Sequence, residues 1–220
     1  MLCLFDIDGT LLLRASAAHA QAVLEAMGTV YGLTERPAGR LQAAGRTDLE
    51  IARQLALLGG VSAERFDDGR DDFRVAASEA YARLCPPDLS AHVAPGIVEV
   101  LEALHAREGV RLAVLTGNLE PIAHLKLARA GLGRFFEHGQ GGFGSDSEDR
   151  LDLPAIARRR AGGYPRAKTV IIGDTPRDIA CARADEVRCI AVATGPYSAA
   201  ELEGADVVLE SAHDLLAVLA

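Results

Sequence analysis

Short apolar runs recur along the chain and predict the strands of a sheet. The four clearest runs cover residues 2–5, 111–115, 169–172 and 188–192. Segments with helical spacing of apolar residues lie between them, and this alternation is typical of a parallel sheet covered by helices. The pattern therefore predicts an α/β fold with a Rossmann-like parallel sheet as its core.

The segment from residue 16 to residue 91 has a different pattern. It has no run comparable to the four strands, and apolar residues recur at helical spacing, at positions 20, 23, 27 and 30 and again at 51, 55 and 58. Thr47 followed by Glu50 has the form of a capping box, which predicts a helix start near Asp48. We therefore expect an α-helical cap domain, residues 16–91, inserted after the first strand into a core made of residues 1–15 and 92–220.

Polar or acidic clusters follow the first three predicted strands. These clusters are Asp6-Ile7-Asp8, Thr116-Gly117-Asn118 and Gly173-Asp174-Thr175. In open α/β sheets, ligands bind beyond the carboxyl ends of the strands. We therefore expect the three clusters to converge on one site.

Two of the clusters carry carboxylates that suit a hard cation. Asp6 and Asp8 lie one residue apart, directly before the flexible Gly9, and strand alternation sends their side chains in similar directions if extended geometry persists. Mg²⁺ prefers oxygen ligands and commonly retains water, so this pair suits it, with Asp174 as a distant third partner. Asp178 lies one turn into the helix predicted after Thr175, where metal support is our interpretation, although a favourable charge at a helix N-terminus explains it too.

The second cluster carries groups that suit the nonbridging oxygens of a phosphate. Thr116 offers a hydroxyl, Gly117 an accessible backbone N–H and Asn118 an amide. Phosphoryl transfer needs such donors together with a cation. Asn118 equally fits the N-cap of the following helix, and the two roles are compatible.

Composition and charge restrict the class of partner. Apolar residues make up 49% of the 220 and charged residues 25%, as in ordinary globular proteins. The net charge of −8 gives no general attraction for nucleic acid or anionic membranes. The N-terminal apolar run, residues 2–5, is far too short for a signal-peptide core, and no later stretch approaches the length of a membrane span. We expect a cytoplasmic protein with no nucleic-acid or membrane partner and, without a self-association signal, a monomer or weak homodimer.

The cysteines and histidines do not predict a metal site. The four cysteines lack CxxC spacing, and the six histidines are scattered along the chain. We expect buried reduced thiols, and histidines at the surface or in supporting positions.

Three ordered motifs resemble the signatures of haloacid dehalogenase-like (HAD) phosphatases, and the resemblance spans nearly the whole chain. The motifs are Asp6-Ile7-Asp8-Gly9-Thr10, Thr116 after an apolar strand, and Gly173-Asp174-Thr175-Pro176-Arg177-Asp178. A lone DxD motif has frequent chance matches, whereas three motifs in order, each after a β-rich run, are far more specific. Phosphoglycolate phosphatase-like members with a helical cap are the most similar group.

The resemblance implies a mechanism and a cofactor. It implies that Asp6 forms an aspartyl-phosphate, while Asp8 first protonates the leaving oxygen and then helps to activate water. It also implies Mg²⁺ bound by the Asp6 carboxylate, the Asp8 backbone carbonyl and Asp174. An acid at position 8 favours phosphoryl transfer over dehalogenation. The phosphate-binding residues that we expect are Gly9, Thr116, Gly117 and Asn118.

The family usually supplies a Lys or Arg between the second and third motifs. Arg150, which precedes a helical run, is our candidate for this catalytic cation. Lys126 is the alternative, although its place in an amphipathic pattern is more simply that of a solvated helix residue. Lys168 introduces a strand and is less favoured.

Arg46 is the expected substrate-specificity residue. Gly45-Arg46-Thr47-Asp48 resembles the substrate-facing loop of capped family members, in which Arg46 would meet an anionic substrate. A helix-capping turn with an exposed arginine explains the segment equally well.

These expectations together predict Mg²⁺-dependent hydrolysis of a small phosphorylated metabolite. The main alternative is a phosphosugar mutase, which would use the same Asp6 and Asp8, and a non-catalytic phospholigand-binding protein is a further one. The motifs define the reaction center and leave the substrate open.

Overall fold

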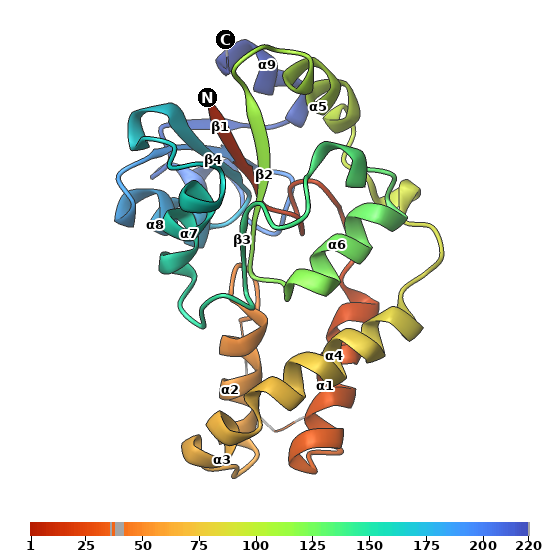
Figure 1. Cartoon of the computed structure of the whole chain (residues 1–220). Helices are drawn as coiled ribbons and strands as arrows, with labels where there is room; N and C mark the ends of the chain where they lie inside the picture. The colour runs from red at the N-terminus through yellow and green to blue at the C-terminus, as the bar shows by residue number, and fades with distance from the viewer. Residues whose placement is uncertain (36, 38–41, 220) are drawn as a thin grey trace.

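A six-stranded parallel sheet forms the core of the computed structural model, which describes residues 1–35, 37 and 42–219 (Figure 1). The strand order is β3-β2-β1-β4-β5-β6, and every pairing is parallel. The strands are β1 (Leu2–Phe5), β2 (Arg111–Thr116), β3 (Gly142–Phe143), β4 (Thr169–Gly173), β5 (Arg188–Val192) and β6 (Val207–Leu209). The predicted α/β class and the four predicted strands are confirmed.

Two short strands at the edges of the sheet were not predicted. Residues 139–144 have the composition of a loop, yet Gly142 and Phe143 pair with the end of β2. Val207–Leu209 pairs with β5 at the opposite edge. Neither segment is long enough to show a strand pattern in the sequence. Each is a strand because it pairs with its neighbour in the sheet.

Helices cover both faces of the sheet, which explains the continuous apolar runs of its strands. Cys3 and Phe5 belong to a core cluster with α5 (Ile97–His105), α6 (Glu120–Arg129) and α9 (Leu215–Val218). Leu2 and Leu4 belong to a second cluster with α7 (Leu153–Arg160) and α8 (Pro176–Ala184). Alternate residues of β1 thus pack on opposite sides. Short 3₁₀ helices complete the core at Ser90–His92, Gly133–Phe135, Arg150–Asp152, Arg166–Lys168, Ala199–Leu202 and Ala212–Asp214.

Four further helices lie between β1 and β2 in the chain and form a separate group beneath the sheet in Figure 1. They are α1 (Ala17–Tyr31), α2 (Asp48–Leu58), α3 (Ala63–Asp68) and α4 (Arg70–Leu84). The Thr47 hydroxyl accepts a hydrogen bond from the Glu50 backbone N–H at 3.0 Å, so the expected start of α2 is confirmed. The Glu50 carboxylate pairs with Arg46 instead of closing the capping box. The proposed cap boundaries, residues 16–91, stay a prediction.

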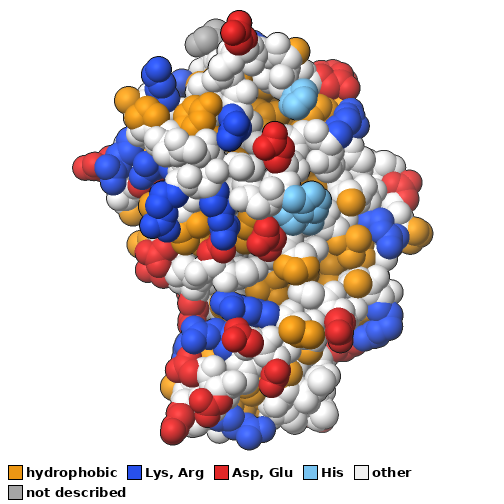
Figure 2. All heavy atoms as spheres, in the orientation of Figure 1, with side chains coloured by type: hydrophobic (Ala, Val, Ile, Leu, Met, Phe, Trp, Pro, Cys, Tyr) orange, Lys and Arg blue, Asp and Glu red, His pale blue; other side chains and the backbone are white. Residues whose placement is uncertain are grey.

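The surface charges and the buried cysteines agree with the expectation of an ordinary globular protein with reduced thiols. Acidic and basic side chains lie interspersed over the face drawn in Figure 2. All four cysteines are buried and unpaired with one another. Among the described residues, no helix combines the length and hydropathy of a bilayer-spanning segment. The expected cytoplasmic location and the monomeric or weakly dimeric state stay predictions.

Candidate active site

The expected site residues gather at the carboxyl ends of the three central strands. Asp6 follows β1, Thr116 ends β2 and Asp174 follows β4, and β1 lies between the other two strands. A cavity of about 620 Å³ opens at this edge. The expected site residues that line it are Asp6, Asp8, Gly9, Arg46, Thr116, Gly117, Asn118, Arg150 and Asp174. Asp178 lies directly behind this lining.

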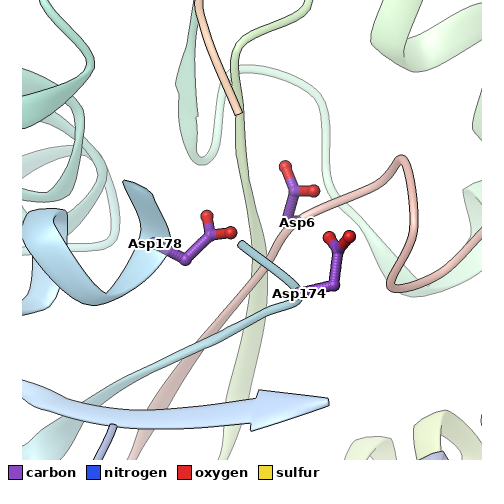
Figure 3. A group of neighbouring side chains, drawn as sticks. All are labelled: Asp6, Asp174 and Asp178. Carbon is purple, nitrogen blue, oxygen red and sulfur yellow. The ribbon is translucent and has the colours of Figure 1, made fainter. Parts of the chain in front are cut away.

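Three buried aspartates lie close together, with Asp6 and Asp174 in the cavity lining and Asp178 behind it (Figure 3). Oxygens of Asp6, Asp174 and Asp178 all lie within 4.8 Å of one another. Burial raises the pKa of Asp174 to about 9, and the Asp6 and Asp178 carboxylates add to the rise. Burial also raises the pKa of Asp6 to about 7, against the opposing charge of Arg150. When all three acids are ionised, the cluster would therefore carry more negative charge than its protein surroundings neutralise.

The environment of Asp174 fits an oxygen-binding divalent cation. Its Oδ1 accepts a hydrogen bond from the Thr10 hydroxyl at 3.2 Å, while its buried Oδ2 has no hydrogen-bond partner among the described residues. Gly9 and Gly195 lie so close to this carboxylate that a Cβ on either would collide with it. A free, buried carboxylate oxygen beside a second acid is suited to Mg²⁺.

Arg150 neutralises part of the acidic cluster. Its side chain is buried, and Nη2 donates to Asp6 Oδ1 at 2.9 Å and to Asp178 Oδ1 at 2.6 Å. Nη1 donates to the Gly45 carbonyl at 3.2 Å. Asp178 is in turn fixed at the start of α8 by the Thr175 backbone N–H and hydroxyl. Of the two candidate cations, Arg150 is therefore the one that contacts Asp6.

Lys126 contacts the other carboxylate of the first motif. The expectation of a solvated helix residue is wrong, because Lys126 is fully buried and its Nζ donates to Asp8 Oδ1 at 2.8 Å and Oδ2 at 2.6 Å. Burial raises the pKa of Asp8, but Lys126, His19 and Asn118 together lower it below its ordinary value. Lys126 and Asn118 therefore hold the Asp8 carboxyl group in one orientation.

His19 and Asp48 extend this contact toward the helical group, and no sequence pattern predicted their role. His19 Nδ1 lies 3.2 Å from Lys126 Nζ, and His19 Nε2 lies 3.0 Å from Asp48 Oδ2. Asp48 Oδ2 also accepts from the Leu119 backbone N–H at 2.8 Å. A buried polar chain thus joins α1 and α2 to α6 and Asp8. No spacing rule connects residues so far apart in the sequence.

The second motif has one role that differs from the expectation. Asn118 is not an N-cap, because α6 begins at Glu120 with Leu119 in the cap position. The Asn118 amide instead donates to Asp8 Oδ2 at 3.0 Å, and its backbone N–H donates to the Thr116 hydroxyl at 3.2 Å. Asn118 therefore helps Lys126 to orient Asp8.

Arg46 lines the cavity but is already paired. Its Nη1 contacts Glu50, and its Nε donates to the Gln42 carbonyl at 2.9 Å. Its backbone carbonyl packs directly against Gly117. The segment that carries Arg46 thus packs against the second motif, at Gly117.

The fold and the site define a class of enzyme. Comparison with known proteins identifies the family. The model of the haloacid dehalogenase-like hydrolases matches residues 3–183. This chain therefore belongs to the haloacid dehalogenase-like hydrolases. Within that family it is a phosphatase, similar to the phosphoglycolate phosphatase group.

The relatives support this placement. A phosphoglycolate phosphatase of Rhodospirillum rubrum is 30% identical over 195 residues, which cover 87% of this chain and 79% of that protein. Phosphoglycolate phosphatase 1 of Pseudomonas aeruginosa is 27% identical, with 98% and 78% covered. A hydrolase structure from Pseudomonas syringae matches with a TM-score of 0.69 at 24% identity, over 100% and 98% of the two chains. A β-phosphoglucomutase structure from Clostridium difficile has a TM-score of 0.70 at 15% identity, over 97% and 92%, which shows a shared fold.

Proposed function

We propose that this protein hydrolyses small phosphomonoesters in a Mg²⁺-dependent reaction, with Asp6 as nucleophile and Asp8 as general acid and base. The observation that carries the proposal is one cavity that presents Asp6, Asp8, Thr116 and Asp174, with Arg150 bonded to the nucleophile. This set supplies a nucleophile, a group that carries the proton, a hydrogen-bond donor to the phosphate oxygens and a carboxylate that could bind the cation.

Mg²⁺ would be held by the Asp6 carboxylate, the Asp8 backbone carbonyl and Asp174. The unpartnered Asp174 Oδ2 and the raised pKa values of Asp6 and Asp174 support this assignment. When bound, the cation would offset the negative charge of the phosphoryl oxygens. Asp178 would support the site by holding Arg150.

The residues of the chain then divide the chemistry. A carboxylate oxygen of Asp6 attacks phosphorus, and the bond between phosphorus and the ester oxygen breaks as Asp8 delivers a proton to that oxygen. Asp8 next takes a proton from the water that attacks the aspartyl-phosphate, which releases inorganic phosphate and regenerates Asp6. The Thr116 hydroxyl and the Gly117 backbone N–H would hold the nonbridging oxygens, because the N–H groups of Gly9 and Asn118 already donate to the Leu12 carbonyl and the Thr116 hydroxyl.

The helices of residues 16–91 would act as the cap that covers this reaction. Thr47 donates from its hydroxyl to the Glu148 carbonyl at 2.7 Å, and Asp48 donates its backbone N–H to the Gly117 carbonyl at 2.8 Å. Arg53 pairs with Glu148 at the same boundary. Closing such contacts over the cavity would exclude bulk water during transfer.

Release of inorganic phosphate tests the proposal. Purified protein with Mg²⁺ should hydrolyse p-nitrophenyl phosphate, and Asp6→Asn should lower kcat by at least about 1,000-fold because the amide is a far weaker nucleophile. Asp68→Asn, an exposed residue of α3, is the matched control and should keep wild-type turnover. An unchanged rate in Asp6→Asn would rule out this assignment. Product analysis with a phosphosugar separates hydrolysis from the mutase alternative, which would return the phosphoryl group to sugar.

A further inference from the structure

The cavity extends beyond the catalytic acids along the helices α1 and α2. Val23 and Leu24 of α1 and Ile51 and Leu55 of α2 line this end, and Leu13 joins it to the core. Asp48, the first residue of α2, donates its backbone N–H to the Gly117 carbonyl, whereas Ile51 and Leu55 lie about one and two turns further along the helix, away from the catalytic acids and Thr116. The cavity therefore has a polar end where phosphorus would react and an apolar end of a different chemical character.

The charges along the described lining do not favour a second anionic group in the substrate. Arg150 is committed to Asp6 and Asp178, and Arg46 is paired with Glu50. Arg14 lies exposed at the rim. Asp48, which also lines the cavity, adds a carboxylate. A buried anion needs a free partner, and two of these three arginines are already neutralised.

The size of the cavity also favours a substrate with a sizeable apolar group. Its volume of about 620 Å³ lies within the range of about 300–1,000 Å³ that encloses drug-sized ligands. A two-carbon phosphate ester would leave most of the apolar lining in contact with water.

We infer that the natural substrate is a phosphomonoester whose leaving group has an apolar alkyl or aryl body, seated between α1 and α2. This inference rests on the proposed function and adds the substrate class to it. Contact with Val23, Leu24, Ile51 and Leu55 would remove apolar surface of both partners from water. Hydrolysis of such an ester releases an apolar alcohol and inorganic phosphate.

A series of n-alkyl phosphates isolates this contact. Methyl, butyl, hexyl and octyl phosphates have leaving groups of similar basicity, so differences in kcat/KM report contact with the alkyl chain. We expect kcat/KM to rise about threefold for each methylene up to hexyl phosphate. We also expect hexyl phosphate to exceed phosphoglycolate under the same conditions.

Two variants on one helix test the location of the chain. Ile51→Asn should lower the ratio of kcat/KM for hexyl to methyl phosphate about tenfold, because a polar group replaces part of the apolar lining. Leu58→Asn, an exposed residue of α2 outside the cavity, should leave the ratio unchanged. General damage to the fold lowers both rates together and leaves the ratio intact.

The outcomes separate this inference from the proposed function. A rising series with a ratio that falls only in Ile51→Asn supports the inference. Turnover with a flat or falling series, or a clear preference for phosphoglycolate, overturns the inference and leaves the proposed function standing. If the protein hydrolyses neither these esters nor p-nitrophenyl phosphate, both are overturned, whereas turnover of p-nitrophenyl phosphate alone overturns only the inference.

Discussion

Lys126 Nζ lies 2.6 Å and 2.8 Å from the two carboxylate oxygens of Asp8, inside a protein interior where the lysine has no exposed surface. Burying a cation is costly unless it is paired, so Lys126 and Asp8 hold each other in place. Arg150 makes the corresponding contact with Asp6. The two acids of the first motif thus have separate cationic partners.

We predict that Lys126→Met impairs proton transfer by Asp8 rather than substrate binding. The kcat/KM for an alkyl phosphate, whose leaving alkoxide needs a proton, should fall about 100-fold. The kcat/KM for p-nitrophenyl phosphate, whose leaving group departs without one, should fall much less. Lys168→Met, an exposed lysine, serves as the control. Equal losses on both esters would show that Lys126 has only a structural role.

We predict that the stabilisation by Mg²⁺ grows with pH. In the fold, burial raises the pKa of Asp6 to about 7 and of Asp174 to about 9, whereas aspartate in an unfolded chain titrates near about 3.9. Between these values the folded state binds more protons than the unfolded state, so these two acids make stability fall as pH rises. Mg²⁺ favours the ionised acids and should offset that loss.

Thermal unfolding with Mg²⁺ and with EDTA measures this effect. The difference in Tm between the two conditions should be small near pH 5 and larger near pH 8. Asp174→Asn should reduce both the difference and its pH dependence. A difference that is the same at both pH values would refute a cation at these acids.

We predict that Arg150→Met destabilises the fold as well as the reaction. It removes the shared partner of Asp6 and Asp178 and leaves both acids buried without it, which should lower the free energy of unfolding by about 3–5 kcal/mol in the absence of Mg²⁺. Arg83→Met breaks an exposed pair with Glu25 and should cost far less, because solvent screens exposed pairs. Urea unfolding of both variants provides the comparison. Similar small losses in the two would mean that the Arg150 pairs contribute little.

The parts of the fold and site that the sequence could predict are those encoded by local pattern. β1, β2, β4 and β5 are continuous apolar runs because both faces of a parallel sheet are covered, and Asp6, Thr116 and Asp174 converge because they follow adjacent strands.

The parts that it could not predict depend on contacts between distant segments. Helical spacing marked Lys126 as a polar position, and only its contacts with Asp8 and His19 explain why it is buried. β3 has two residues, one of them Gly142, so local strand propensity does not predict it. It forms a strand because it pairs with β2.

We predict that Gly117→Ala weakens substrate binding by separating the helical group from the core. A Cβ at position 117 would collide with the backbone carbonyl of Arg46, which cannot move without shifting the segment before α2. The hydrogen bond from the Asp48 backbone N–H to the Gly117 carbonyl would be lost with that shift. KM should rise about tenfold, and kcat should fall by a smaller factor. Gly131→Ala, at a glycine whose added Cβ meets no neighbour, is the control, although its positive φ adds a small strain. Wild-type kinetics in Gly117→Ala would show that this close contact is not needed.

The most direct measurement is chemical trapping of the phosphorylated nucleophile. Enzyme mixed with Mg²⁺ and substrate is quenched into hydroxylamine, which converts an acyl phosphate to a hydroxamate, and peptides are then analysed by mass spectrometry. Our account predicts that the hydroxamate forms at Asp6, that it depends on substrate, and that Asp6→Asn removes it. Steady turnover with no modification at Asp6, or with modification at a different carboxylate, would contradict the account.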